Sequence, residues 1–319
     1  MMITGSRGAA LAAAGLLALL LLVPLAHNDY LTIVFRGILM YAAMAYGWNM
    51  IGGYTGYVSF GNVVFFGLGA YCSAVLSSLG INVLIADVAL ACVVCAVFAA
   101  VVGFPILRLR GHYFAIATLA VGLAVSDVVG NLDALGGTGG LALKQLAGAS
   151  FVWYYYAMWA VAACSMAATY LIARSKLGYA FVAIRENEDA AAVLGIDATR
   201  YKIVAWAIGA MMAGAAGAVF APANGFIDPS ITFSVDSNVF PIVMTLLGGV
   251  GTVAGPFIGA LLLAGANEVL QRTFLQIHTL FFGAIIVLVI LLLPRGLIWL
   301  FGMRGGLRAW RRTLTVYKA

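Results

Sequence analysis

Residues 174–202, RSKLGYAFVAIRENEDAAAVLGIDATRYK, form the one long polar passage of a chain that is otherwise apolar. Nine of the 28 charged side chains (17 basic and 11 acidic) fall within these 29 residues. Apolar sequence follows on both sides, and charged side chains are costly to place in hydrocarbon. We therefore predict that this passage lies in water between two membrane spans, where a soluble protein can meet it.

The passage also carries the signals of a short helix of its own. Asn187 is a good N-cap, because its side-chain oxygen can accept a free N–H group of the first turn. Glu188 and Asp189 follow at the positive end of the helix dipole, and Gly195 can take the left-handed conformation that ends a helix. Such a stubby helix with small side chains is suited to be gripped by another protein. The alternative is a plain solvated linker between two spans.

The composition indicates a helical membrane protein. The chain is 64% hydrophobic and only 9% charged, whereas soluble domains carry roughly 25% charged residues. Apolar runs long enough to cross a bilayer recur along the whole length, and the short alternating segments of a membrane barrel are absent. We predict an all-α polytopic membrane protein, with residues 1–319 forming a single transmembrane domain.

About ten transmembrane or re-entrant helices are expected. In chain order they are 8–26, 30–51, a span ending near 79, 82–107, 112–129, 151–173, 201–221, a short run at 239–247, 253–266 and 281–293. The run at 239–247 is too short to span alone. The first run could be a cleaved signal peptide, but it is long for one and position 24 is proline, so we expect a retained span.

The basic residues predict the orientation of the spans. With ten spans and both termini inside, 14 of the 17 Lys and Arg residues fall in the cytoplasm, as the positive-inside rule requires. Arg36, Lys144 and Arg272 fall elsewhere. The passage 174–202 and a basic tail at 295–319 are therefore both predicted to be cytoplasmic.

The sequence assembles no recognisable catalytic or metal-binding set. None of the four lysines follows a glycine, so the phosphate-binding loop G-x-x-x-x-G-K cannot be present. His27, His112 and His278 are far apart in sequence. We predict that the chain is not an enzyme and binds no metal or cofactor, so any use of ATP requires another subunit. The net charge of +6 follows from the cytoplasmic loops and does not indicate nucleic acid.

A few ionisable residues fall within the apolar runs. Asp87 and Asp127 lie near the ends of their spans, and Glu268 precedes Arg272 by four residues, so the two can pair on one helix face. We expect these residues to be structural. A proton-driven carrier would instead favour a carboxylate at mid-membrane.

Two glycine-rich passages, around 52–61 and 248–255, interrupt apolar runs in opposite halves of the chain. Paired broken segments point to a transport path, because unwound backbone offers polar groups to a solute. We therefore predict that a translocation path is lined by Gly53, Tyr54, Ser59, Gly61, Gly248 and Gly249. The alternative is tight helix packing through the glycines.

Six blocks of sequence carry a family resemblance. They are GYTGYVSFGNVVFFGLGAY (53–71), LRLRGHYFAIATLA (107–120), GGTGGL (136–141), RSKLGYAFVAIRENEDAAAVLGI (174–196), LLGGVGTVAGPFIGA (246–260) and LPRGL (293–297). Together they resemble the LivM-type permease subunit of branched-chain amino acid ABC importers, over nearly the whole chain. The cytoplasmic signature of ABC permeases, Glu-Ala-Ala, three residues and Gly, is matched from Asp189 to Gly195, with Asp in place of Glu.

The resemblance implies an ABC importer permease fold and a coupling helix that docks on an ATPase subunit. The implied coupling residues are Arg185, Glu186, Asn187, Glu188, Asp189, Ala190, Ala191 and Gly195. The implied partners are a sister permease subunit, two ATPase subunits that bind ATP and Mg, and a periplasmic solute-binding protein, in a bacterial inner membrane. The ATPases would drive alternating access of the spans.

The expected solutes are leucine, isoleucine and valine. Tyr57 and Asn62 depart from the Gln and His that such permeases often carry, so other amino acids, urea or short amides stay open. Two other classes of membrane protein are alternatives to an ABC permease. A stand-alone secondary transporter would work without ATPases, and an intramembrane enzyme would need a catalytic set that the sequence lacks.

Overall fold

The computed structural model of the chain describes residues 7–143, 150–273, 283 and 296–298, and these are helical almost throughout. The helices are α1 Arg7–Leu19, η1 Leu20–Ala26, α2 Asp29–Trp48, η2 Asn49–Tyr54, α3 Asn62–Ser78, α4 Leu84–Ile106, α5 His112–Asn131, η3 Asp133–Leu135, η4 Gly137–Gly139, α6 Phe151–Ala173, α7 Lys176–Glu186, α8 Glu188–Val193, α9 Ala198–Asn224, α10 Pro229–Thr232, α11 Val235–Gly248 and α12 Gly255–Thr273. The two-residue strands β1 Leu141–Ala142 and β2 Phe226–Ile227 pair antiparallel. The predicted all-α class is confirmed.

Seven helical segments of the described chain are long and apolar enough to cross a bilayer. They are Gly8–Ala26, Asp29–Tyr54, Leu84–Ile106, His112–Asn131, Phe151–Ala173, Ala198–Asn224 and Pro229–Gly248. The polytopic class is confirmed, but the predicted number of about ten helices is not. The predicted span at 281–293 lies, apart from Gly283, outside the described residues, as does nearly all of the tail at 295–319.

Several predicted boundaries are wrong by a few residues, among them the end of the run at 253–266, which continues as α12 to Thr273. The second span does not end at Ile51, because the helix continues without a break as the π-helical turn η2 to Tyr54. The span predicted to end at Ala221 continues to Asn224, with Pro222 inside it and Gly225 beyond it in the left-handed conformation.

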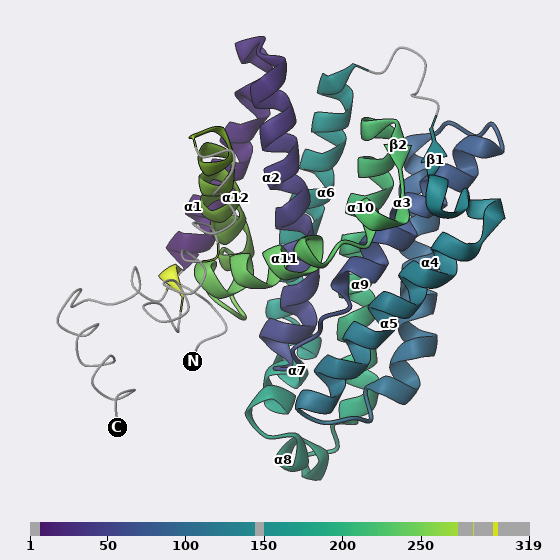
Figure 1. Ribbon diagram of the computed structural model, residues 1–319. Coiled ribbons are helices and arrows are strands. Elements are labelled where there is room, and N and C mark those ends of the chain that lie inside the picture. The colour runs from purple at the N-terminus through teal and green to yellow at the C-terminus, as the bar shows by residue number, and fades with distance from the viewer. Residues whose placement is uncertain (1–6, 144–149, 274–282, 284–295, 299–319) are drawn as a thin grey trace.

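Helix α9 is the central element of the bundle, and it packs against α2, α3, α4 and α6 (Figure 1). Its small residues permit close approach of neighbouring backbones. A Cβ atom added at Gly69 of α3 would lie 2.0 Å from the carbonyl oxygen of Gly214, and one added at Gly217 would lie 2.0 Å from that of Phe66. The abundance of glycine is therefore explained in part by helix packing.

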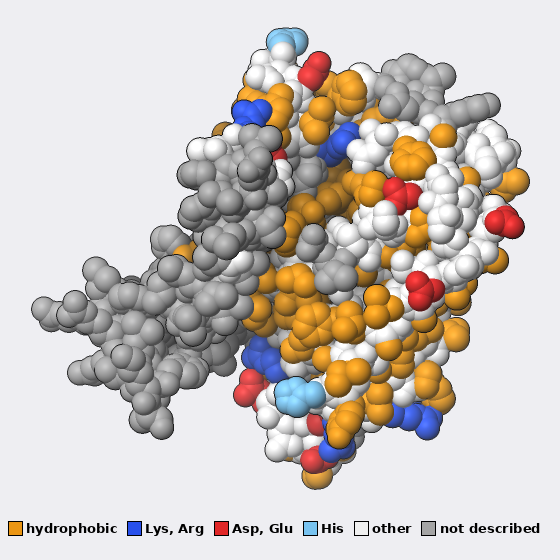
Figure 2. Space-filling view, in the orientation of Figure 1, with side chains coloured by type: hydrophobic (Ala, Val, Ile, Leu, Met, Phe, Trp, Pro, Cys, Tyr) orange, Lys and Arg blue, Asp and Glu red, His pale blue; other side chains and the backbone are white. Residues whose placement is uncertain are grey.

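Helix α4 shows which side of the bundle faces lipid. Ala91, Cys95, Ala99 and Gly103 are buried against the protein, with α9 as the main neighbour. Large apolar side chains of the opposite face are exposed: Val93, Val97, Val101 and Phe104. Figure 2 shows hydrophobic side chains over the middle of the visible face, with charged groups gathered mainly toward its two ends. This is the distribution expected of a protein surrounded by hydrocarbon at mid-height.

Helix α11 is only 14 residues long and runs across the long axes of α2 and α6 (Figure 1). It packs against α2 and α12, which follows after a break at residues 249–254. Together with α10 it forms the segment Pro229–Gly248, which is long and apolar enough to cross a bilayer. That residues 239–247 are too short to span alone therefore stays a prediction.

Candidate coupling and translocation site

Helix α8 begins and ends as the sequence predicts. The side-chain oxygen of Asn187 accepts a hydrogen bond from the backbone N–H of Ala190 at 3.0 Å, so the N-cap is confirmed. Glu188 and Asp189 occupy the first turn. Gly195 has φ +83°, a left-handed conformation that side chains disfavour, which explains why glycine stands after the helix.

The outward surface of α8 combines polar and apolar groups. Five of the eight predicted coupling residues are exposed: Glu186, Asn187, Asp189, Ala190 and Gly195. Val193 and Leu194, at the C-terminal end of the helix, are 88% and 77% exposed. The sequence prediction missed these two residues. The sequence did contain a usable signal for them, because two large apolar side chains within a polar passage are unfavourable in water unless a partner covers them.

One charge of the polar passage does not lie in water, contrary to the prediction. Lys202, in the second turn of α9, is only 1% exposed. Its ammonium group lies 2.9 Å from a carboxylate oxygen of Glu188 and 3.1 Å from the hydroxyl oxygen of Tyr57. The Tyr57 hydroxyl donates to the other carboxylate oxygen of Glu188. These three side chains come from three separate segments, and we call them the Lys202 cluster.

The Lys202 cluster keeps Glu188 ionised. Partial burial alone would raise the pKa of the Glu188 carboxyl. Hydrogen bonds from Tyr57 and Lys202 and the charges of Lys202 and Arg110 outweigh burial, so that the pKa falls below its ordinary value. Burial and the hydrogen bond to Glu188 raise the pKa of Tyr57, which therefore remains a hydroxyl donor at neutral pH. The cluster is thus a stable pair of opposite charges with a neutral phenol between them.

Two further contacts join the polar passage to the membrane domain. The guanidinium group of Arg185, at the end of α7, donates to the carbonyl oxygen of Gly53 at 3.0 Å. Arg110, in the turn after α4, lies 3.2 Å from Asp189. Both partners of this second pair are exposed, so water screens their attraction and it contributes little. The Arg185 contact is part-buried and so less screened by water, and it reaches the first glycine-rich passage directly.

The two glycine-rich passages lie against each other. Asn49, the first residue of η2, is fully buried, and its side-chain oxygen accepts from the backbone N–H of Gly251 at 2.8 Å. Its amide nitrogen donates to the carbonyl oxygen of Thr252 at 3.0 Å. A Cβ atom added at Gly53 would lie 2.7 Å from the backbone nitrogen of Gly251. Sequence reasoning missed Asn49, although a polar residue inside an apolar run was a usable signal.

The six predicted path residues are all buried in the chain as described: Gly53, Tyr54, Ser59, Gly61, Gly248 and Gly249. They do not all meet at this contact, since Gly53 lies against Gly251 whereas Gly61 lies against Thr118 of α5. The hydroxyl oxygen of Tyr54 is buried and has no hydrogen-bond partner among the described residues. Gly248 is packed tightly, since an added Cβ would lie 1.8 Å from the carbonyl oxygen of Gly255. Close packing therefore explains Gly248, and the path itself stays a prediction.

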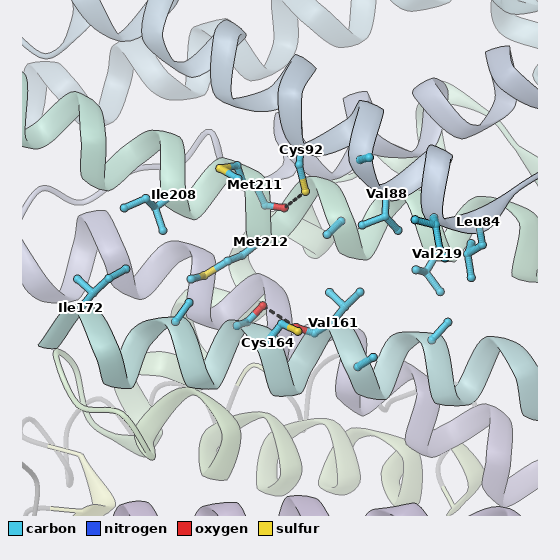
Figure 3. A pocket seen from close by; sticks show the side chains of 17 residues that line it. Leu84, Val88, Cys92, Val161, Cys164, Ile172, Ile208, Met211, Met212 and Val219 are labelled. Carbon is cyan, nitrogen blue, oxygen red and sulfur yellow. Dashed lines mark hydrogen bonds between the residues drawn. The ribbon is translucent and has the colours of Figure 1, made fainter. Parts of the chain in front are cut away.

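A cavity of about 700 Å³ lies elsewhere, between α4, α6 and α9. Figure 3 shows its lining, with Val88 and Cys92 from α4, Cys164 from α6 and Met211 from α9. Among its described lining residues Ser165 has the one hydroxyl group, which donates to the carbonyl oxygen of Val161 at 2.8 Å. The charged ends of an amino acid need polar partners, so this cavity does not suit such a solute.

Several ionisable residues inside the predicted spans have structural partners. Glu268 and Arg272 pair at 3.7 Å, as predicted. Arg36 donates to the side-chain oxygen of Asn224 at 3.1 Å, next to the C-terminal end of α9, where a positive charge is favourable. Asp87 is buried at the start of α4 and accepts from the Ser73 hydroxyl at 3.0 Å. Within the described ranges, no group of three or more His, Cys, Asp or Glu residues could hold a metal ion.

Comparisons with known proteins agree with this architecture. A family model described as "Branched-chain amino acid transport system / permease component" matches residues 30–290. The high-affinity branched-chain amino acid transport system permease protein LivM of Salmonella typhimurium is 30% identical, over 82% of this chain and 68% of the relative. The LivH permease protein of the same organism is 28% identical, over 84% of this chain and 95% of its own length.

Similarity also extends to a permease that is named for another cargo. The autoinducer 2 import system permease protein LsrC of Klebsiella pneumoniae is 31% identical, over 48% of this chain and 50% of its own length. No solved structure matches the chain. The family match covers most of the chain, and the LivM similarity covers a similar share of it. This chain therefore belongs to the family of permease components of branched-chain amino acid transport systems.

Proposed function

We propose that this chain is the membrane-spanning permease subunit of an ATP-driven importer that moves branched-chain amino acids into a bacterial cell. Family membership and the similarity to LivM and LivH support this function. The chain itself binds no cofactor. ATP and Mg are bound by separate ATPase subunits, and their closure drives the spans between outward-open and inward-open states.

The observation that carries the proposal is the exposed end of α8. Val193 and Leu194 are exposed at the C-terminal end of this short, capped helix. Helix α8 itself lies at one end of the bundle (Figure 1). Apolar side chains of this size favour a partner that covers them. The occupant we propose is a groove of an ATPase subunit, with the apolar end inserted and the acidic first turn at its rim.

The end of the molecule that carries α8 is the cytoplasmic one. Lys and Arg residues of the described chain gather there: Arg108, Arg110, Arg174, Lys176, Arg185, Arg200 and Lys202. Arg36 and Arg272 lie instead near Asn224 and Tyr30, away from α8. The positive-inside rule then supports an orientation with α8 in the cytoplasm. The similarity to a permease of Salmonella typhimurium supports the proposal of a bacterial inner membrane. Both termini are proposed to share that side.

The importer needs other subunits. The proposed assembly contains a sister permease, two ATPase subunits and a periplasmic solute-binding protein. Similarity to both LivM and LivH, two permease proteins of one organism, supports a pair of related permeases. The cargo named for LsrC differs, which supports recognition of the solute largely by the binding protein.

The test is uptake of labelled leucine into proteoliposomes that contain the complete assembly. We expect uptake only with ATP, Mg and the binding protein together, and competition by isoleucine and valine but not by urea. Competition by urea with none by valine would move the cargo to short amides. Uptake by this chain alone, without ATPases, would refute the importer and establish a secondary transporter.

A further inference from the structure

The Lys202 cluster is built differently from an ordinary surface ion pair. The Lys202 side chain is only 1% exposed, and its ammonium group contacts both Glu188 and Tyr57 and lies 4.2 Å from the centre of the Tyr57 ring. A buried charge is stable only while its partners stay in place. The three side chains must therefore move together, or the contact must break as a unit.

The members of the cluster belong to parts of the molecule with different roles. Glu188 is the first residue of α8, the helix proposed to contact the ATPase. Lys202 belongs to α9, the central helix of the bundle. Tyr57 belongs to the segment between η2 and α3, inside the first glycine-rich passage. The cluster is therefore the point where α8, the bundle core and the first glycine-rich passage meet.

A second contact runs parallel to the first. Arg185 donates to the Gly53 carbonyl oxygen, four residues before Tyr57. From there Asn49 continues to the backbone of Gly251 and Thr252, between α11 and α12. Arg185 thus connects α7 to the turn η2, and Asn49 of the same turn connects it to the second glycine-rich passage, while the Lys202 cluster connects α8 to the first passage.

We propose that Lys202, Glu188 and Tyr57 are positioning residues that transmit the displacement of α8 to residues 49–61, which comprise the turn η2 and the first glycine-rich passage. This inference rests on the proposed function and adds the residues by which ATP-driven motion reaches the spans. Glu188 then acts on the membrane side of α8, whereas Val193 and Leu194 act on the ATPase side. The three residues contribute to coupling rather than to docking.

The test measures the amount of solute transported per ATP hydrolysed in the reconstituted complete assembly. Lys202→Met keeps the length of the side chain and removes its charge. We expect the assembly to co-purify and to hydrolyse ATP, with the transport ratio reduced at least threefold, within the range of roughly 2- to 30-fold typical of coupling residues. The charge exchange Lys202→Glu with Glu188→Lys should recover a large part of the ratio.

Two variants keep the test decisive. Tyr57→Phe retains the ring and its packing against Phe114 but loses the hydroxyl bonds to Glu188 and Lys202, so it should also lower the ratio if Lys202→Met fails to fold. Arg200→Met is the matched control, because Arg200 lies two residues from Lys202 and its pair with Asp197 is exposed. It should leave the ratio unchanged.

The outcomes separate the two proposals. A normal ratio in an assembled Tyr57→Phe complex, or an equal loss in Arg200→Met, would overturn the positioning role while wild-type uptake still supported the importer. Absence of ATP-driven uptake in the wild-type assembly would refute the importer, and the positioning role with it.

Discussion

The side-chain oxygen of Asn49 accepts a hydrogen bond from the backbone N–H of Gly251 at 2.8 Å, across 202 positions of the chain. The same side chain donates to the carbonyl oxygen of Thr252. One amide therefore pairs with two backbone groups that lie between α11 and α12 and have no intrahelical hydrogen bond. The π-helical turn after α2 and the break between α11 and α12 are thereby held as one structure.

Replacing Asn49 should weaken this structure strongly. Asn49→Ala leaves a buried N–H and a buried carbonyl without partners, and we expect a loss of about 2 to 4 kcal/mol in the free energy of unfolding. Unfolding of the purified chain in mild detergent micelles measures it. Asn131→Ala is the matched control, since Asn131 is exposed and donates only to the carbonyl of Asp127. Equal stability of the two variants would contradict the bridging role.

The packing of α3 on α9 gives a second prediction. Gly69→Ala forces a methyl group against the Gly214 backbone, and overpacking of this kind costs about 1 to 3 kcal/mol. Gly37→Ala, in α2, meets nothing within 4 Å, so it should be neutral or gain up to about 1 kcal/mol from helix propensity. Thermal unfolding of both variants in detergent checks the contrast. A Gly69→Ala variant as stable as Gly37→Ala would show that the close contact is not required.

The pH dependence of stability tests the charge state of the Lys202 cluster. The folded pKa of Glu188 lies below its ordinary value of 4.5, so its contribution to stability is complete above that value and lost as the pH falls through the depressed pKa. The difference in melting temperature between wild type and Glu188→Gln should be constant from about pH 8 to pH 6 and shrink only in acid. A difference that grew as the pH fell would contradict the assignment.

The sequence predicted the membrane class, the position of α8 and its caps because these depend on local features. Apolar runs mark spans, and Asn187 and Gly195 mark helix ends within a few residues of where they act. The Glu268–Arg272 pair was predictable for the same reason, since both residues lie on one helix. The resemblance extended this local reading to a family, and the family match confirms it.

Features that depend on distant segments were not predictable. From the sequence alone, Lys202 is predicted to be a solvated charge, because only the fold brings Tyr57 and Glu188 into contact with it. The contact between the two glycine-rich passages needs α2 and α11 side by side, which no local pattern specifies. The predicted number of about ten helices is not confirmed, since seven segments of the described chain are long and apolar enough to cross a bilayer and most of the predicted span at 281–293 lies outside the described residues. The orientation of α11, which lies across the bundle (Figure 1), depends on its packing against α2 and α12 and has no local signal in the sequence.

The proposed ATPase contact is tested most directly by isolating the chain from its native membrane in mild detergent and identifying the proteins bound to it. We expect ATPase subunits with the wild-type chain and with Leu79→Asp, a control in which an exposed leucine in the turn before α4, remote from α8, is changed. Leu194→Asp should lose them at least about tenfold, because a charge would be buried in an apolar groove. Equal recovery of ATPase subunits with Leu194→Asp, or their absence from the wild-type preparation, would contradict docking through α8.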